Sequence, residues 1–150
     1  MRAGEFYFLD TNILLEATDS KRKYHCEALA LFSLAHEQGA HLAISGQVFR
    51  EYHVVATRPV IGNGLGIAAK LALENAESFL DRCVFFEETR EVFDVLSKLI
   101  AAHEITGKKV HDANIAATLK AHRIENLVTL NSKDFVAFAW VCVLSPSEAL

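Results

Sequence analysis

The chain has 150 residues, a length at which one domain can enclose a hydrophobic core. Hydrophobic residues make up 51% of it and charged residues 23%, which is typical of a folded protein and excludes a disordered polar chain. We therefore expect one domain over residues 1–150. The formal net charge of −4 argues mildly against nucleic-acid binding, because phosphate contacts usually draw on an excess of Lys and Arg.

The sequence indicates no membrane segment and no disulfide framework. Its longest apolar stretches, such as 110–119, are broken by polar residues and fall short of the roughly 20 residues that span a bilayer. The N-terminus lacks the length and cleavage site of a signal peptide. The cysteines are odd in number and far apart, at Cys26, Cys83 and Cys142. We expect a cytoplasmic protein with reduced thiols.

The first third of the chain alternates between short apolar strands and amphipathic helices. The run Phe6–Leu9 lacks a helical period and predicts a strand, and the side chains of Asp10–Asn12 are of the kinds that commonly cap a following helix. Apolar residues recur at helical spacing over Lys23–Gln38. A strand is predicted at His41–Ile44, and Ser45 is expected to cap a helix that runs to about Thr57.

The rest of the chain continues this alternation beyond a loop rich in glycine at 62–66. Helices are predicted at Ile67–Leu80, 92–100 and Asp112–His122. Strands are predicted at Cys83–Phe86, Leu127–Thr129 and Val141–Leu144, before a short tail that opens at Ser145–Pro146. Because strands separated by helices need crossover connections, we expect an α/β fold with three layers, in which helices cover both faces of a parallel sheet of four or five strands.

Three carboxylates belong to segments that can reach one edge of this sheet. Asp10 follows the first strand directly, at the edge where parallel sheets bind ligands, although capping of the next helix explains it equally well. Asp112 begins an apolar helix and has the same alternative. Glu51 lies on an apolar helical face, where a charge needs a partner, and a salt bridge with Arg50 or Arg58 is the alternative there.

Carboxylates gathered at one place repel each other unless a cation lies between them. Hard divalent ions such as Mg²⁺ prefer oxygen ligands and keep several waters for reaction. Such an ion can polarise a phosphoryl oxygen and help to form hydroxide from water. The acids therefore suit a divalent cation such as Mg²⁺ and hydrolysis at a phosphoryl group.

Four segments carry a family resemblance that covers nearly the whole chain. They are Phe8–Leu15, Arg50–Tyr52 with Ala56–Pro59 and Asn63–Gly66, Gly107–Ala113, and Thr129–Phe135. In this order they resemble the motifs of PIN-domain ribonucleases, and in particular of VapC toxins from type II toxin-antitoxin pairs. The resemblance implies a PIN-like fold, an endoribonuclease dependent on Mg²⁺ or Mn²⁺, an RNA substrate, an antitoxin protein as partner, and a homodimer.

Matched residue by residue, the catalytic and metal-binding acids of the family fall on Asp10, Glu51 and Asp112. Asn131 occupies the fourth catalytic position, where many relatives have aspartate. Because an amide cannot supply that charge, we expect Asn131 to orient a metal-bound water, with Asp134 as the alternative acid. Further support for the site is expected from Thr11, Asn12 and Thr129.

Neighbouring residues offer weaker signals. His111 stands next to Asp112 and could shape the site or contact RNA, and Lys108–Lys109 could contact phosphates. His36–Glu37 and His103–Glu104 resemble the start of the HExxH motif of zinc proteases. Ala40 and Gly107 stand where the second histidine of that motif is required, which excludes protease chemistry of this kind.

Three other functions fit parts of the same pattern. One is an RNA-processing PIN nuclease that is not a toxin, and another is a catalytically silent PIN-like domain that binds RNA or protein. The third is a phosphatase in which Asp10 is the nucleophile, as in haloacid-dehalogenase-like enzymes. Those enzymes carry a second aspartate where this chain has Asn12, and this argues against the third reading.

Overall fold

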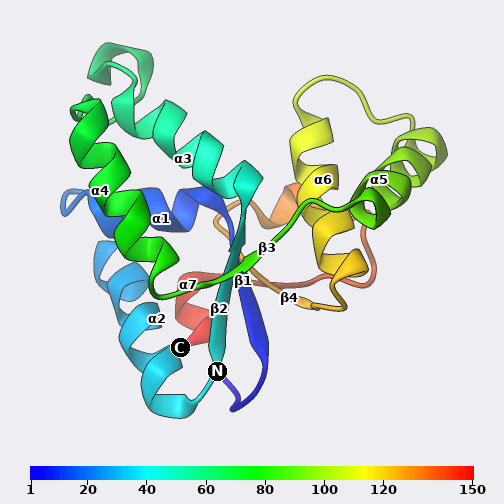
Figure 1. Cartoon of the computed structure of the whole chain (residues 1–150), viewed down its shortest axis with the longest axis horizontal. Coiled ribbons are helices and arrows are strands. Elements are labelled where there is room, and N and C mark those ends of the chain that lie inside the picture. The colour runs from blue at the N-terminus through cyan, green and yellow to red at the C-terminus, as the bar shows by residue number, and fades with distance from the viewer.

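A sheet of five parallel strands lies at the centre of the molecule (Figure 1). The computed structural model describes all 150 residues. The strands are β1 (Phe6–Leu9), β2 (His41–Ser45), β3 (Val84–Phe86), β4 (Asn126–Val128) and β5 (Cys142–Leu144). Their order across the sheet is β3-β2-β1-β4-β5, so β1 is the central strand. The predicted parallel sheet and its strands are confirmed, and no strand bound differs from its prediction by more than one residue.

Helices cover both faces of the sheet and make the three expected layers. The α-helices are α1 (Thr11–Thr18), α2 (His25–Gln38), α3 (Gly46–Thr57), α4 (Ala69–Leu80), α5 (Arg90–His103), α6 (Lys109–Ala121) and α7 (Pro146–Ala149). Two 3₁₀ helices are η1 (Val60–Gly62) and η2 (Ser132–Phe135). In Figure 1, α1 to α4 lie on one side of the sheet and the pair α5 and α6 lies on the other. No helix has the length and apolar character needed to cross a bilayer.

The hydrophobic core forms around β1, because this strand has neighbours on both edges and helices on both faces. Tyr7, Phe8 and Leu9 are all buried, and they belong to a single cluster of 33 buried apolar residues. Strands buried on both faces read as continuous apolar runs. This explains why the run before Asp10 could be assigned as a strand from the sequence.

Several local predictions were wrong in detail. Neither Asp10 nor Ser45 caps a helix through its side chain, and the Ser45 hydroxyl is buried without a hydrogen-bond partner. Helix α6 begins at Lys109, so Asp112 lies in its first turn and does not begin it. The C-terminal tail folds into α7, because Ser145 and Glu148 form a reciprocal capping box.

Candidate active site

Asp10 lies at the carboxyl end of β1 and is only 8% exposed. Its Oδ2 accepts hydrogen bonds from Thr129 Oγ1 at 2.6 Å and from Asn12 Nδ2 at 2.6 Å. Burial raises the pKa of Asp10, while the hydrogen bond from Thr129 opposes that rise. Oδ1 receives no side-chain hydrogen bond. Both side-chain donors thus hold the same carboxylate oxygen.

The segment after β4 is tied to the start of α1 through the same hydroxyl. Thr129 Oγ1 accepts hydrogen bonds from Asn12 Nδ2 at 3.1 Å and from the backbone N–H of Asn131 at 3.0 Å. In turn Asn12 Oδ1 accepts from the backbone N–H of Leu130 at 3.1 Å. The structure therefore brings the expected supporting residues Asn12 and Thr129 around Asp10.

Glu51 reaches the site from α3, and both of its oxygens accept hydrogen bonds. Oε2 accepts from Thr11 Oγ1 at 3.1 Å. Oε1 accepts from Gln47 Nε2 at 2.7 Å and lies 3.1 Å from Nδ1 of His111. The alternative salt bridge is not formed, because Arg50 instead binds both carboxylate oxygens of Glu88 at 3.1 Å each.

The pKa of Asp112 is raised by burial and by the negative charges of three other acids. Burial raises its pKa to about 6, with further rises from the negative charges of Asp134, Asp10 and Glu51, in that order. Glu51 and Asp112 line one groove, and Asp112 and Asp134 line the hollow beside it. The structure therefore brings together Asp10, Glu51 and Asp112, which belong to three different segments of the chain.

Two residues are candidates for the fourth catalytic position, Asn131 and Asp134. Asn131 precedes η2 and is exposed, and its backbone rather than its side chain is bonded to Thr129. Asp134 lies within η2, and of the three acids that repel Asp112 it has the largest effect. The negative charge at this end of the site therefore comes from Asp134.

Gln47 and Asn114 contribute side-chain amides to the site that were not predicted from the sequence. Gln47 Nε2 donates to Glu51 and, at 3.0 Å, to the backbone carbonyl of His111. Asn114 Nδ2 donates to Gln47 Oε1 at 2.7 Å. Gln47 stands one helical turn before Glu51, and this spacing was the available signal for its role.

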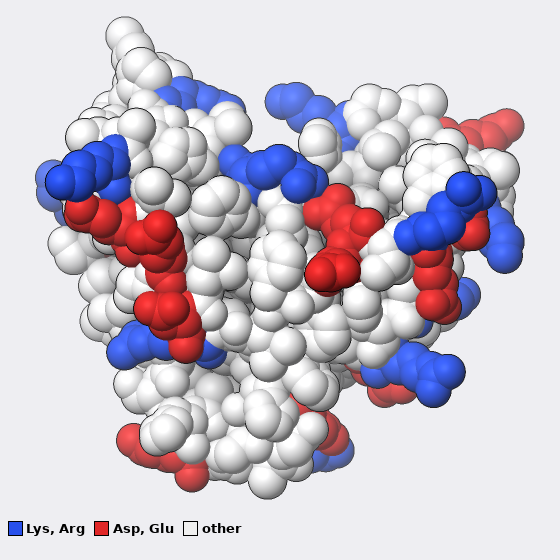
Figure 2. All heavy atoms as spheres, in the orientation of Figure 1, with Lys and Arg blue, Asp and Glu red and all other residues white.

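An open groove of about 860 Å³ extends from the acids between α3, α5 and α6. Figure 2 shows a notch in this surface with basic residues near its edges. The lining combines apolar side chains with charged ones: Val54, Val55, Val92, Phe93 and Leu96 with Arg50, Arg58 and Lys108. The loop after α3 folds back tightly against Arg58, since a Cβ at Gly64 would collide with the Arg58 backbone.

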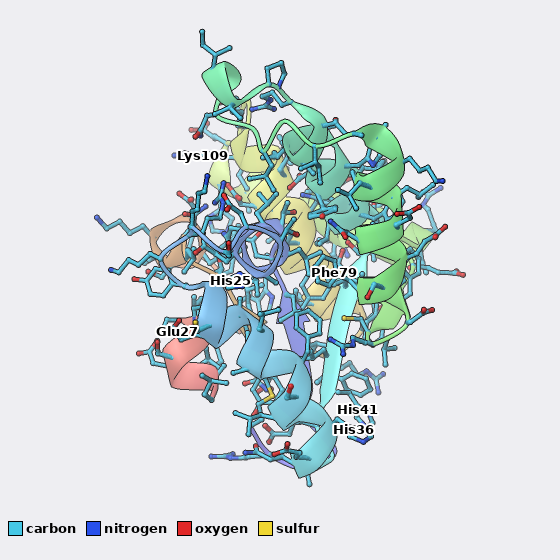
Figure 3. The ribbon with its side chains drawn as sticks, turned by 90° about the vertical axis from the view of Figure 1, so that its left-hand side faces the viewer. His25, Glu27, His36, His41, Phe79 and Lys109 are labelled. Atoms are coloured by element: carbon cyan, nitrogen blue, oxygen red, sulfur yellow. The ribbon has the colours of Figure 1, made fainter.

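A smaller hollow of about 390 Å³ lies beyond Asp112, between α5, α6 and η2. It is lined by Asp112 and Asp134 and also by Lys109 and Lys133. Figure 3 shows Lys109 at the end of the molecule away from His36. His36 is therefore remote from the hollow that Lys109 lines.

The donor chemistry of the site fits a divalent cation. No three His, Cys, Asp or Glu side chains converge on one point as a formed metal site would require. Mg²⁺ and Mn²⁺ nevertheless prefer carboxylate oxygens, and Mg²⁺ needs only one or two of them beside its waters. The repulsion at Asp112 is the electrostatic condition that such a cation relieves. Asp10, Asp112 and Glu51 remain the candidate ligands, since Glu51 Oε2 accepts only the hydrogen bond from Thr11 and both side-chain donors to Asp10 bind its Oδ2.

Comparison with known proteins identifies the family and the fold. The family model described as PIN domain matches residues 7–141. No curated protein sequence matches the chain.

Solved structures share the fold over almost the entire chain. VapBC2 from Rickettsia felis, bound to a DNA fragment from its promoter, has a TM-score of 0.72 at 20% identity and covers 93% of this chain and 98% of its own. DNA-bound VapBC from Salmonella typhimurium has a TM-score of 0.68 at 18% identity, with 97% and 99% covered. Mycobacterium tuberculosis VapC20, described as a sarcin-ricin loop cleaving toxin, has 0.67 at 15%, with 87% and 94% covered. At these identities the similarity shows the fold.

Proposed function

Because the chain belongs to the PIN domain family, we propose that it is a metal-dependent endoribonuclease and the toxin of a type II toxin-antitoxin pair. The observation that carries the proposal is the convergence of acidic charge on Asp112, at the carboxyl edge of a parallel sheet. An open groove beside these acids offers room for a polymer substrate. The cation is Mg²⁺ or Mn²⁺, and the substrate is RNA.

The residues have separate tasks in this proposal. Asp10, Asp112 and Glu51 would hold the cation, directly or through its waters. When bound, the cation polarises the phosphoryl oxygen and makes water a better nucleophile. Thr129 and Asn12 keep the Asp10 carboxylate oriented through their 2.6 Å hydrogen bonds. Asp134 supplies the fourth acidic group, and Asn131 orients a water.

The toxin role is supported by the fold shared with toxin-antitoxin proteins, among them a complex from Klebsiella pneumoniae with 24% identity and a TM-score of 0.64. In such a pair an antitoxin protein inhibits the nuclease, and the groove beside the acids, with its apolar and charged side chains, is the surface that a folding peptide segment would cover. We further propose a homodimer that acts in the cytoplasm, where its RNA substrate is found.

A cleavage assay tests the enzyme. The purified chain should cut a mixed RNA pool with Mg²⁺ or Mn²⁺, and the activity should be lost with EDTA. Asp10→Asn, Glu51→Gln and Asp112→Asn should each lose cleavage while the folded state persists. RNA binding without any cleavage would instead identify a silent PIN-like domain, and cleavage retained in all three variants would refute the proposed site.

Two further observations separate the alternatives. A cognate partner encoded beside the gene, and inhibition of cleavage by that partner, would distinguish a toxin from an RNA-processing nuclease. Trapping of an aspartyl-phosphate on Asp10 would support the phosphatase reading. We expect none, because Asn12 stands where those phosphatases carry their second aspartate.

A further inference from the structure

The side-chain amide of Gln47 joins two helices that come from opposite faces of the sheet. Its Nε2 donates to Glu51 Oε1 on its own helix α3, and also to the backbone carbonyl of His111 on α6. Its Oε1 accepts from Asn114 Nδ2, one turn further along α6. Figure 1 shows α3 and α6 on opposite sides of the sheet, and the hydrogen bonds of Gln47 connect them. One amide thus connects the segments that carry Glu51 and Asp112.

The orientation of this amide is fixed by its neighbours. Gln47 is 4% exposed, so water cannot replace a lost partner at low cost. Asn114 presents an N–H donor to Oε1, and this leaves Nε2 to face the carboxylate of Glu51 and the His111 carbonyl. If the amide were reversed, three favourable contacts would become repulsive. The Gln47 side chain is therefore held in one position by three hydrogen bonds.

The remaining donors to Glu51 cannot replace this contact. Thr11 binds the other oxygen, Oε2, and reaches it from α1. His111 binds Oε1, but its side chain is 63% exposed and free to move into solvent. Gln47 makes the shortest hydrogen bond to Glu51, at 2.7 Å, and is the buried donor to Oε1.

We infer that Gln47 is a positioning residue, which sets the distance and orientation between Glu51 and the α6 turn that carries Asp112. This inference depends on the proposed metal-dependent nuclease. Gln47 contacts neither substrate nor cation. It acts by holding the carboxylate of Glu51 and the backbone next to Asp112 at one spacing, so that the acids bind one cation together. Asn114 contributes by fixing which way the amide points.

Two substitutions test the role in different ways. Gln47→Met keeps the length and volume of the side chain and removes all three hydrogen bonds. Asn114→Asp keeps Gln47 but replaces the donor by an acceptor, so the amide must turn and present Oε1 to Glu51. The added negative charge alone would strengthen cation binding. Weaker Mn²⁺ binding by Asn114→Asp would therefore indicate that the Gln47 amide has turned round. Thr118→Val is the matched control, since Thr118 is buried on α6 and its hydroxyl bonds only the Asn114 carbonyl.

Mn²⁺ affinity is measured by calorimetry without RNA, beside the melting temperature without metal and kcat and KM for RNA cleavage. Both test variants should bind Mn²⁺ about 10- to 100-fold more weakly, as is usual when the residues that orient metal ligands are changed. Their kcat should fall while KM for RNA stays near that of the parent. Thr118→Val should change the melting temperature without changing the Mn²⁺ affinity.

Parental Mn²⁺ affinity and kcat in Gln47→Met would overturn the inference. If Gln47→Met does not fold, Asn114→Asp decides, and unchanged or tighter Mn²⁺ binding there overturns it. A parent that neither binds Mn²⁺ nor cleaves RNA would instead refute the proposed function, and the role of Gln47 with it. A parent that does both, beside test variants that match it, refutes the role of Gln47 alone.

Discussion

Thr129 Oγ1 donates a 2.6 Å hydrogen bond to Asp10 Oδ2, which links the end of β4 to the end of β1 across 119 residues of sequence. This bond satisfies a carboxylate that burial would otherwise penalise. It also positions the segment of Asn131, whose backbone N–H donates to the same hydroxyl at 3.0 Å. The two strands thus cooperate in holding the carboxylate that we assign to the cation.

Thr129→Val should therefore destabilise the protein although it preserves side-chain shape. Loss of a buried hydrogen bond to a charged group costs about 2 kcal/mol, and the cost should be larger at pH 7 than in acid, where Asp10 becomes protonated. Urea unfolding at the two pH values measures it. Thr118→Val, which removes a buried hydroxyl from an intrahelical bond, serves as the control. An equal loss in both variants, independent of pH, would contradict this role of Thr129.

Asp112→Asn should stabilise the metal-free protein at neutral pH. The pKa of Asp112 is raised to about 6 in the folded state from 3.8, so the folded protein binds this proton more tightly than the unfolded chain does. Ionisation of Asp112 therefore costs stability as pH rises from about 4 to about 6, and the full cost is present above that window. Because the side chain is partly exposed, a gain of about 1 kcal/mol is expected after screening.

Melting temperatures across pH 4 to 8, with and without Mn²⁺, check this prediction. The parent should lose stability relative to Asp112→Asn as pH rises, and added Mn²⁺ should raise the parent more. A parent that melts higher than the variant without metal, and that shows no larger Mn²⁺ shift, would mean that Asp112 is only a structural residue of α6.

The central strand and the acidic residues could be predicted from the sequence, because both have local signals. The strand Phe6–Leu9 is buried on both faces, so its apolar run was a direct signal. The acids lie in motifs with local spacing and could be matched one by one. The contact between Gln47 and Asn114 gave no such signal, because it joins positions 67 residues apart and exists only in the folded chain.

The predicted helix cap at Asp10 failed for a different reason, because tertiary contacts took the place of the local hydrogen bond. Asp10 has the residue type and position of an N-cap, yet its side chain makes no cap hydrogen bond and instead binds Thr129 and Asn12. At the C-terminus the local rule was sufficient and was missed, since Ser145 and Glu148 stand at capping-box spacing. Deviations of this kind at Asp10 are expected where a site overrides local preference.

Asp134→Asn should damage cleavage more than any change at Asn131. Asp134 is the strongest source of negative charge acting on Asp112, whereas the Asn131 side chain is exposed and makes no hydrogen bond with the site. Removing the Asp134 charge should also lower the pKa of Asp112, which NMR titration of the carboxyl carbon would detect. Asn131→Asp should preserve or raise activity at fixed Mn²⁺. Full activity of Asp134→Asn, together with an unchanged pKa of Asp112, would remove Asp134 from the site.

The basic residues beside the groove should bind RNA phosphates. Arg58 and Lys108 line the groove and form no salt bridge within the chain, whereas Arg50 is paired with Glu88. Their charges therefore remain available to a polyanion even though the chain as a whole is acidic. For single-stranded RNA, each phosphate contact adds about 0.7 to the slope of log affinity against log salt concentration.

The double variant Arg58→Ala with Lys108→Ala should therefore bind RNA more weakly and reduce that slope by about 1.4 if each residue contacts one phosphate. Binding is best measured in the Asp112→Asn background, so that the RNA remains intact. Lys70→Ala is the control, because Lys70 is exposed on α4 and pairs only with Glu74. A slope unchanged in the double variant, or reduced equally in the control, would show that RNA does not follow this groove. The acidic edge of the sheet would then have to be approached from the hollow lined by Lys109 and Lys133.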